Sequence, residues 1–317
     1  MVILYIALSL IVFIAITLSV IGAVGYKQAC VSQRIRPPET IPKKILRTEI
    51  RKKNNAYLYS TNPEDLELTS ADGLKLKAWF APSVNGSKRF AICIHGHNCN
   101  GPDECSHLFP LYRNTLGYNY LLPDLRGHGR SEGNKIGFSA LDYKDINLWI
   151  DYLVDRFGED IEIILHGISM GAATAMMVNN HSPRKQVKLI IEDCGFTNAY
   201  EQVGLKVKQI MKGREAPHIL MMINLYCRIF SKYDLKKDAN PLGTMKNAVN
   251  PVLFIHGEED DLVPFYMCGQ LYEACPVSKE IFTVPGATHA YSYYDAKEEY
   301  DKKVMQFIEK HLDNVKT

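Results

Sequence analysis

Apolar residues along this chain recur at two spacings, and the way these alternate predicts the architecture. Short continuous apolar runs are typical of strands buried on both faces of a sheet. Such runs occupy residues 90–94, 118–124, 163–166, 187–194, 251–257 and 279–284. From Phe138 to Phe157, and from about Asp295 to Leu312, helical spacing is indicated instead. Strands that alternate with helices predict an α/β fold, with a mostly parallel, doubly wound sheet and helices on both faces.

Two segments depart from this alternation. Residues 66–69 and 74–80 alternate apolar and polar positions on either side of Asp72-Gly73, which predicts an antiparallel hairpin at one edge of the sheet. From about residue 196 to 248 the pattern shows no clear strand, only helical stretches rich in methionine and aromatic residues. We expect a helical lid insertion there, because an insertion near strand ends is well placed to cover a site. An ordinary set of packing helices is the alternative.

The first 26 residues form a separate region, because no charged side chain occurs from Val2 to Tyr26. This stretch is long enough to cross a bilayer as an N-terminal transmembrane helix, and we expect a membrane anchor at 1–26. A cleaved signal peptide is the alternative, but it would normally carry Lys or Arg before a shorter apolar region. We expect residues 27–63 to be a charged linker with one short helix near the membrane surface, and residues 64–317 to form a single domain.

Basic residues after the apolar stretch bear on the orientation in the membrane. Lys27, Arg34, Arg36, Lys43 and Lys44 all follow it. By the positive-inside rule they favour a single-pass membrane protein whose large domain lies in the cytoplasm. Large domains can be translocated despite such charge, so an extracytoplasmic domain remains the alternative.

Composition narrows the classes of partner. The formal net charge is +2, and no basic stripe is interleaved with aromatic residues, so we expect no nucleic-acid partner. The eight cysteines form neither a metal-type pair nor a compact disulfide pattern, which favours a reducing compartment. No histidine has a partner at metal-ligand spacing, and we expect neither a metal nor another cofactor.

The strongest chemical signal is Gly167-Ile168-Ser169-Met170-Gly171, which follows a strand-like run and precedes small residues typical of a helix. A serine on so tight a strand-to-helix turn needs neighbours without bulk, because the backbone is strained and the helix packs closely. The turn would raise the Ser169 hydroxyl above the edge of the sheet, at the positive end of the following helix. This is the sequence pattern of a nucleophile elbow.

A serine nucleophile needs a base, and the base needs an orienting carboxylate. In a doubly wound sheet these groups are expected in loops just past strand ends. One such loop holds the acidic residues 258–261, and another holds His289. The chain order Ser169, Asp260, His289 is the order expected after this type of elbow.

Together these segments resemble the α/β-hydrolase fold superfamily, from about Leu66 to Leu312. Four motifs agree in order, namely His95-Gly96, Asp124-x-Arg126-Gly127-His128-Gly129-x-Ser131, Gly167-x-Ser169-x-Gly171, and Gly257-x-x-Asp260-x-x-Val263-Pro264 with a downstream His289. Within the superfamily, the sequences at 166–174 and 192–197 are most similar to membrane-anchored bacterial serine hydrolases of the serine aminopeptidase S33/BEM46-like type.

The resemblance implies a role for each of the three residues. Ser169 would be the nucleophile, His289 the general base and then acid, and Asp260 the carboxylate that holds the imidazole tautomer. The rivals of Asp260 for the last role are Glu258, Glu259, Asp261 and, at the end of the preceding strand, Asp193.

The oxyanion formed when Ser169 attacks an acyl carbon needs two fixed donors. The backbone N–H of Met170 would supply one, and the backbone N–H of His97, in the loop after the first parallel strand, would supply the other. The Asn98 side chain is a further candidate. Because Met170 and His97 would act through main-chain atoms, replacing their side chains should matter less than replacing the triad.

The function expected from these residues is hydrolysis of carboxylic esters, with a small-molecule or lipid-derived ester as substrate and an acyl-enzyme intermediate. An aminopeptidase or amidase with the same triad is the alternative, and it would need a carboxylate such as Glu201, Glu215 or Asp234 to hold the substrate amine. A catalytically silent, membrane-bound interaction module is a remote alternative, since such a protein normally lacks a triad residue.

Overall fold

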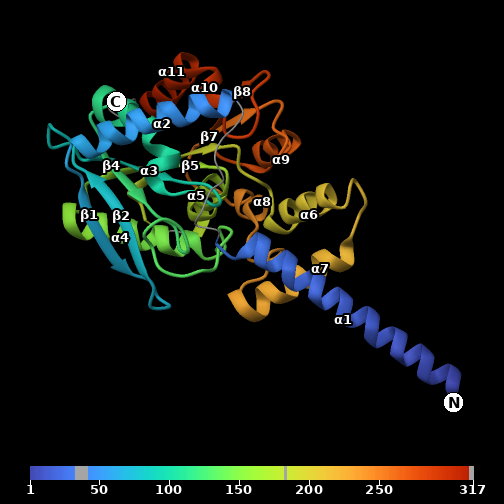
Figure 1. The fold of residues 1–317 in the computed structure, drawn as a ribbon. Helices are drawn as coiled ribbons and strands as arrows, with labels where there is room; N and C mark the ends of the chain where they lie inside the picture. Colours follow the sequence, from blue (N-terminus) through green and yellow to red (C-terminus); the bar gives the residue numbers. More distant parts are fainter. Residues whose placement is uncertain (33–41, 182–183, 314–317) are drawn as a thin grey trace.

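The computed structural model describes residues 1–32, 42–181 and 184–313. Within these residues eight strands form one sheet, in the spatial order β1-β2-β4-β3-β5-β6-β7-β8 (Figure 1). The strands are β1 (Glu64–Thr69), β2 (Lys75–Ala81), β3 (Arg89–Ile94), β4 (Asn119–Pro123), β5 (Glu162–Ile168), β6 (Val187–Asp193), β7 (Val252–Gly257) and β8 (Lys279–Val284).

Strand pairing confirms the mostly parallel sheet with a hairpin at one edge. β1 pairs with β2, and β2 with β4, in antiparallel fashion, whereas the pairings from β4 through β3 to β8 are all parallel. The hairpin turns at Gly73, whose φ of +86° favours glycine. Parallel strands bring their carboxyl ends to one edge of the sheet, where the loops after β3, β5, β7 and β8 meet.

Helices cover both faces of the sheet, as expected. One layer holds α4 (Asp142–Phe157), α5 (Met170–His181) and α9 (Tyr266–Ala274). The other holds α3 (Gly101–Cys105), η1 (Ser106–Leu108), η2 (Pro110–Thr115), α10 (Ser292–Asp295), α11 (Lys297–Ile308) and η4 (Glu309–Asp313). Along β3, Phe90, Ile92 and Ile94 pack into the first core, while Ala91 and Cys93 pack into the second. This alternation explains why the strand sequences are continuously apolar.

Residues 42–60 differ from the expected linker. They form α2 (Pro42–Ser60), which packs on α3 and η1 and buries Leu58. The Arg51 guanidinium donates to the buried Glu104 carboxylate at 2.7 Å, and Arg47 pairs with the same carboxylate. A buried carboxylate needs paired cations. The helix expected near the membrane surface is therefore a longer one, and two of its charges fix it to the domain. Residues 33–41 of the expected linker, which include Arg34 and Arg36, lie outside the described residues.

The first helix, α1 (Val2–Cys30), is 29 residues long and continues past the expected end at Tyr26. Its length and its apolar composition suit a membrane span, and a signal sequence would pass the same test. The chain then joins the domain directly, because the Ser32 N–H donates to the Asn134 carbonyl and the Ile136 N–H donates to the Cys30 carbonyl.

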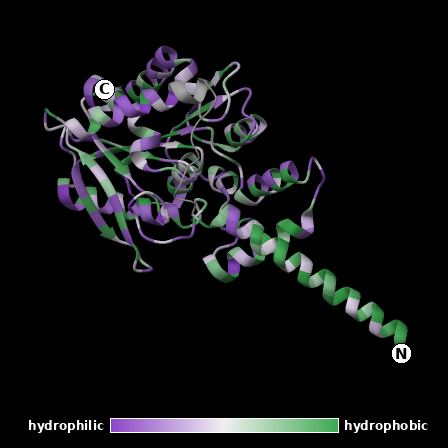
Figure 2. Ribbon diagram, viewed as in Figure 1, coloured by the Kyte–Doolittle hydropathy of each residue, from purple (hydrophilic) through white to green (hydrophobic). Residues whose placement is uncertain are grey.

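The segment between β6 and β7 contains helices and no strand among its described residues, as expected. It contains α6 (Ala199–Ile210), α7 (Pro217–Tyr226), η3 (Cys227–Ser231) and α8 (Pro241–Met245). The side chains of Asn198 and Asn240 cap α6 and α8 by accepting backbone N–H groups, and Pro217 opens α7. α7 lies along the end of α1, and Figure 2 shows apolar residues continuing from one helix to the other.

Candidate active site

Ser169 lies at a sharp turn between β5 and α5, with a φ of +57° that is unusual for a residue with a side chain. A Cβ on Gly167 would lie 2.1 Å from the Gly171 carbonyl oxygen, and a Cβ on Gly171 would lie 2.0 Å from the Ile94 carbonyl oxygen. Only glycine fits at either position. The Ser169 N–H donates to the Asp193 carbonyl on the neighbouring strand, so the strained turn is held by the sheet itself.

The structure brings Ser169, Asp260 and His289 together at the carboxyl edge of the sheet. The Nε2 atom of His289 lies 2.9 Å from Ser169 Oγ, and its Nδ1 lies 2.8 Å from Asp260 Oδ2. The His289 side chain is 17% exposed, whereas the Asp260 side chain is fully buried. A continuous line of hydrogen bonds therefore runs from an accessible hydroxyl to a buried carboxylate.

Several donors hold the Asp260 carboxylate. Its Oδ1 accepts the backbone N–H groups of Leu262 and Val263, at 2.9 and 2.8 Å. Burial by itself raises the pKa of Asp260, but hydrogen bonds from His256 and His289 outweigh it and hold the pKa well below its usual range. Asp260 is therefore ionised at neutral pH, as required of a group that stabilises a charged imidazole.

The four rival acids have other surroundings. Asp193 Oδ2 accepts the Tyr300 hydroxyl at 2.9 Å, and burial raises the pKa of Asp193 to about 6. Glu258 accepts the Thr283 hydroxyl. Glu259 and Asp261 are exposed. None of these carboxylates is hydrogen-bonded to His289 among the contacts of the described residues.

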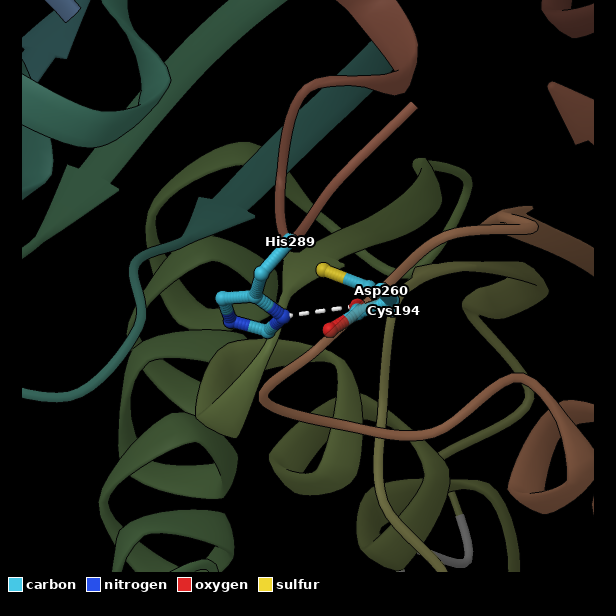
Figure 3. A group of neighbouring side chains, drawn as sticks. All are labelled: Cys194, Asp260 and His289. Carbon is cyan, nitrogen blue, oxygen red and sulfur yellow. Dashed lines mark hydrogen bonds and ion pairs between the residues drawn. The ribbon is translucent and has the colours of Figure 1, made fainter. Parts of the chain in front are cut away.

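Cys194, Asp260 and His289 place one potential metal-ligand atom each within 4.8 Å of one another. Figure 3 shows the imidazole turned toward the carboxylate, with the Cys194 sulfur beside them. Burial raises the pKa of the Cys194 thiol well above its usual range, so the thiol stays protonated and is a poor ligand. The Nδ1 of His289 is already bonded to Asp260. This chemistry fits proton transfer better than metal binding.

The loop after β3 passes directly beside Ser169. A Cβ on Gly96 would lie 3.2 Å from Ser169 Cβ, and His97 lines the same cavity as Ser169 and Met170. Met170 is the first residue of α5, where backbone N–H groups have no acceptor within the helix. Asn98, whose side chain was the further candidate, also lines this cavity, and its backbone N–H donates to His128 Nε2 at 3.1 Å.

A cavity of about 550 Å³ opens above Ser169. The domain contributes His97, Phe138 and Met170 to its walls. The insertion contributes apolar side chains of α6 and α7, namely Val203, Val207, Ile210 and Ile223. The insertion therefore covers the site, as expected of a lid.

A sequence model described as the alpha/beta hydrolase family matches residues 91–302. The chain belongs to the alpha/beta hydrolase family. The match spans the sheet from β3 to β8, including the elbow, Asp260 and His289.

Relatives of this alpha/beta hydrolase occur in bacteria, plants and yeast. The protein YqkD of Bacillus subtilis is 27% identical over 244 residues, which cover 76% of this chain and 78% of YqkD. The alpha/beta hydrolase domain-containing protein WAV2 of Arabidopsis thaliana is 26% identical, covering 78% and 79%. YNL320W of Saccharomyces cerevisiae, which is named as a membrane protein, is 24% identical, covering 71% and 73%.

Solved structures show the same fold. An esterase of Pyrococcus furiosus matches with a TM-score of 0.65 and 21% identity, covering 89% of this hydrolase and 98% of the esterase. An esterase of Exiguobacterium antarcticum matches with a TM-score of 0.56 and 19% identity, covering 78% and 100%. At these identities the likeness concerns the fold.

Sequence reasoning missed two features of the site in this alpha/beta hydrolase. His256, at the end of β7, has its Nε2 3.4 Å from Asp260 Oδ2 and 2.8 Å from the Val263 carbonyl oxygen. The only sequence signal for this contact was that His256 stands four residues before Asp260. The second feature is that Gly25, Gln28 and Ala29 of α1 line the cavity, and nothing in the local sequence indicates this.

Proposed function

We propose that this protein is a serine hydrolase that cleaves carboxylic esters through an acyl-enzyme on Ser169. One observation carries the proposal: the unbroken hydrogen-bond line from Ser169 through His289 to Asp260, with distances of 2.9 and 2.8 Å. Nucleophile, base and orienting acid at these distances are the arrangement that acyl transfer requires. These two hydrogen bonds disfavour a catalytically silent interaction module, since no member of the triad is missing.

The chemistry follows from these positions. Ser169 Oγ attacks the ester carbon while its proton passes to His289 Nε2, and the carbonyl oxygen becomes an oxyanion. The carbon–oxygen bond to the alcohol then breaks, and His289 gives its proton to the departing alkoxide. Water attacks the acyl-enzyme, its proton moves to His289, and Ser169 recovers a proton as the carboxylic acid leaves. Asp260 stays ionised and stabilises the transient imidazolium.

We assign the oxyanion hole to the backbone N–H groups of His97 and Met170. Support comes from the passage of the 95–98 loop beside Ser169 and from the position of Met170 at the start of α5. Donors on a rigid loop and a helix N-terminus need no reorganisation when the negative charge develops.

An ester is a better candidate substrate than a peptide with a free N-terminal amine. The described residues that line the cavity include no carboxylate, and Lys206 supplies the charge there. The carboxylates considered as amine binders are engaged elsewhere, Glu201 with Tyr266 and Thr197, Glu215 with Lys208, and Asp234 with Arg228. An aminopeptidase needs a buried negative partner for the substrate ammonium group, so the cavity favours the esterase.

We further propose that α1 is retained as a single-pass membrane anchor, with the hydrolase domain in the cytoplasm. Tyr26 and Cys30 in its last turns are buried against the insertion, and residues 30–32 bond to the 134–136 loop. Cleavage within α1 would expose or remove these buried residues, so the packing favours retention of the helix. The cytoplasmic orientation is supported by the basic residues that follow the apolar stretch.

Turnover of p-nitrophenyl esters and aminoacyl anilides by the purified full-length protein in detergent tests the proposed activity. We expect ester hydrolysis that is lost in Ser169→Ala, and little cleavage of the anilides. Anilide cleavage with the larger kcat/KM would instead assign the aminopeptidase reaction. Absence of turnover for both series by folded protein would contradict the serine hydrolase altogether.

A further inference from the structure

The end of the membrane helix forms one wall of the cavity that holds the nucleophile. Gly25, Gln28 and Ala29 of α1 line the cavity together with Ser169. The Nε2 of His97 lies 3.0 Å from the Ala29 carbonyl oxygen, so the loop beside Ser169 also contacts α1 through a side chain. The site is therefore built partly from the anchor.

The position of this wall is fixed by close packing between α1 and the insertion. A Cβ on Gly22 would lie 2.4 Å from Met222 Cβ, so α1 and α7 approach at a glycine. Hydroxyl hydrogen bonds join Ser19 to Tyr226 at 2.6 Å and Tyr26 to Ser231 at 2.8 Å. Small residues and polar bonds of this kind are what hold helices together where the surroundings are lipid.

The insertion carries exposed apolar residues, and its helices α7 and η3 contact α1. Ile210 and Met221 are 60% and 58% exposed. The other exposed large apolar residues of the insertion are Met211, Leu225, Ile229 and Phe230. Figure 2 shows apolar residues along the ribbons of both α1 and the adjacent α7. Because α1 itself is apolar on all sides, the bilayer is the partner that fits both.

The depth of the cavity follows from helix geometry. About 20 helical residues cross a hydrocarbon core of about 30 Å, so the apolar residues from Val2 to about Ile21 suffice. At a rise of about 1.5 Å per residue, Gly25 and Gln28 then lie about 6 and 10 Å beyond the hydrocarbon, among the lipid headgroups. Ile210 lines the cavity and is exposed, so the cavity reaches the surface beside this layer.

We propose that the substrate is a single-chain lipid ester taken directly from the bilayer, and this rests on the esterase activity proposed above. Its acyl chain lies in the cavity between the end of α1 and α6, which is lined by Gln28 of α1 and Val207 of α6, while Gly25 packs directly against Ile223 and closes the cavity toward α7. Its ester carbonyl lies at Ser169, and its alcohol leaves after the acyl group has passed to the serine. The anchor is thus a specificity-determining part of the acyl site as well as a tether.

Filling the acyl site from either wall tests this assignment. Gln28→Trp fills it from α1, and Val207→Trp fills it from α6, so the test stands if one variant fails to fold. Val24→Phe is the matched control, because Val24 is 51% exposed on α1 and does not line the cavity. Each full-length protein is assayed in the same detergent micelles with p-nitrophenyl decanoate and p-nitrophenyl acetate. The ratio of the two kcat/KM values does not depend on the folded fraction.

We expect the decanoate-to-acetate ratio to fall at least about tenfold in the two cavity variants, equivalent to about 1.4 kcal/mol, and to stay at the wild-type value in Val24→Phe. Wild-type protein in phosphatidylcholine vesicles should also release oleate from monooleoylglycerol. Unchanged ratios in folded cavity variants, or an equal fall in Val24→Phe, would overturn the acyl site. Ester hydrolysis without oleate release would overturn uptake from the bilayer. Absence of all ester turnover would instead refute the esterase activity itself.

Discussion

Asp260 differs from the acidic residues beside it in burial and in hydrogen bonding. Its side chain is fully buried and accepts N–H groups from Leu262, Val263 and His289, while Asp261 next to it is exposed. Adjacent carboxylates of equal chemistry therefore have different surroundings. Asp261 is therefore a matched control for substitutions of Asp260.

Asp260→Asn should lower kcat by about 10⁴-fold, because an amide favours the wrong imidazole tautomer and cannot stabilise the imidazolium. Asp261→Asn should leave kcat within about twofold, as expected for an exposed side chain. Steady-state turnover of a p-nitrophenyl ester measures both. Similar losses in the two variants would remove Asp260 from the role of orienting acid.

Glu192, on β6 behind the site, is expected to make stability depend on pH. Burial raises its pKa from 4.5 to about 8. Between these values the folded chain holds a proton that the unfolded chain has lost. The free energy of unfolding therefore falls as the pH rises, by at most about 1.4 kcal/mol per pH unit from this group.

Glu192→Gln removes this titration and keeps an oxygen that can accept the Gly195 N–H, which Glu192 Oε2 accepts at 2.8 Å. We expect the difference in Tm, variant minus wild type, to increase steadily from pH 5 to pH 8. Thermal unfolding in detergent, followed by fluorescence, measures the difference. A difference that does not change with pH would show that Glu192 is ionised in the folded chain.

The elbow is the element whose sequence most strictly determines its geometry. Gly171→Ala should lower the free energy of unfolding by about 3 kcal/mol or more, since the new methyl would meet the Ile94 carbonyl oxygen at 2.0 Å. Gly269→Ala, in α9 with no atom within 4 Å of the new methyl, should raise it by about 0.5–1 kcal/mol. Thermal unfolding of both variants provides the comparison, and equal stability would mean that the turn can relax.

Sequence patterns predicted the elements that depend on local spacing, and missed those that depend on distant partners. The β5–α5 turn, the edge hairpin and the helical insertion follow from glycines and apolar periods within a few residues. The docking of α2 depends on Arg51 meeting Glu104, which is 53 residues away. The motif Gly257-x-x-Asp260 singled out Asp260 from the sequence, whereas the contact of His256 with Asp260 is visible only in the fold.

In the molecule as a whole, the apolar helix α1, the insertion and the carboxyl edge of the sheet meet at one cavity. α1 contacts α7 along its last turns and reaches the Ser169 cavity through Gly25, Gln28 and Ala29. A residue pattern read along the chain cannot show this meeting, because α1 (residues 2–30) and the helices of the insertion (residues 199–245) are far apart in the sequence. Removing α1 would open one wall of the site.

Retention of α1 predicts that protein purified from the membrane fraction has the mass of the full chain, 35.9 kDa. Intact-mass spectrometry of the detergent-solubilised protein measures it. With a cytoplasmic domain, external protease added to intact cells should leave that mass unchanged. A species shortened by cleavage within α1, found in the soluble fraction, would show that the helix is a signal sequence.

Covalent labelling with a fluorophosphonate, followed by intact-mass measurement, shows whether Ser169 is a nucleophile activated by His289. We predict one adduct per wild-type chain, mapped to Ser169 by peptide mass spectrometry, absent from Ser169→Ala and strongly slowed in His289→Ala. Folded wild-type protein that takes up no probe would contradict this role of Ser169. Labelling of Ser169→Ala to the same extent as the wild type would contradict it as well.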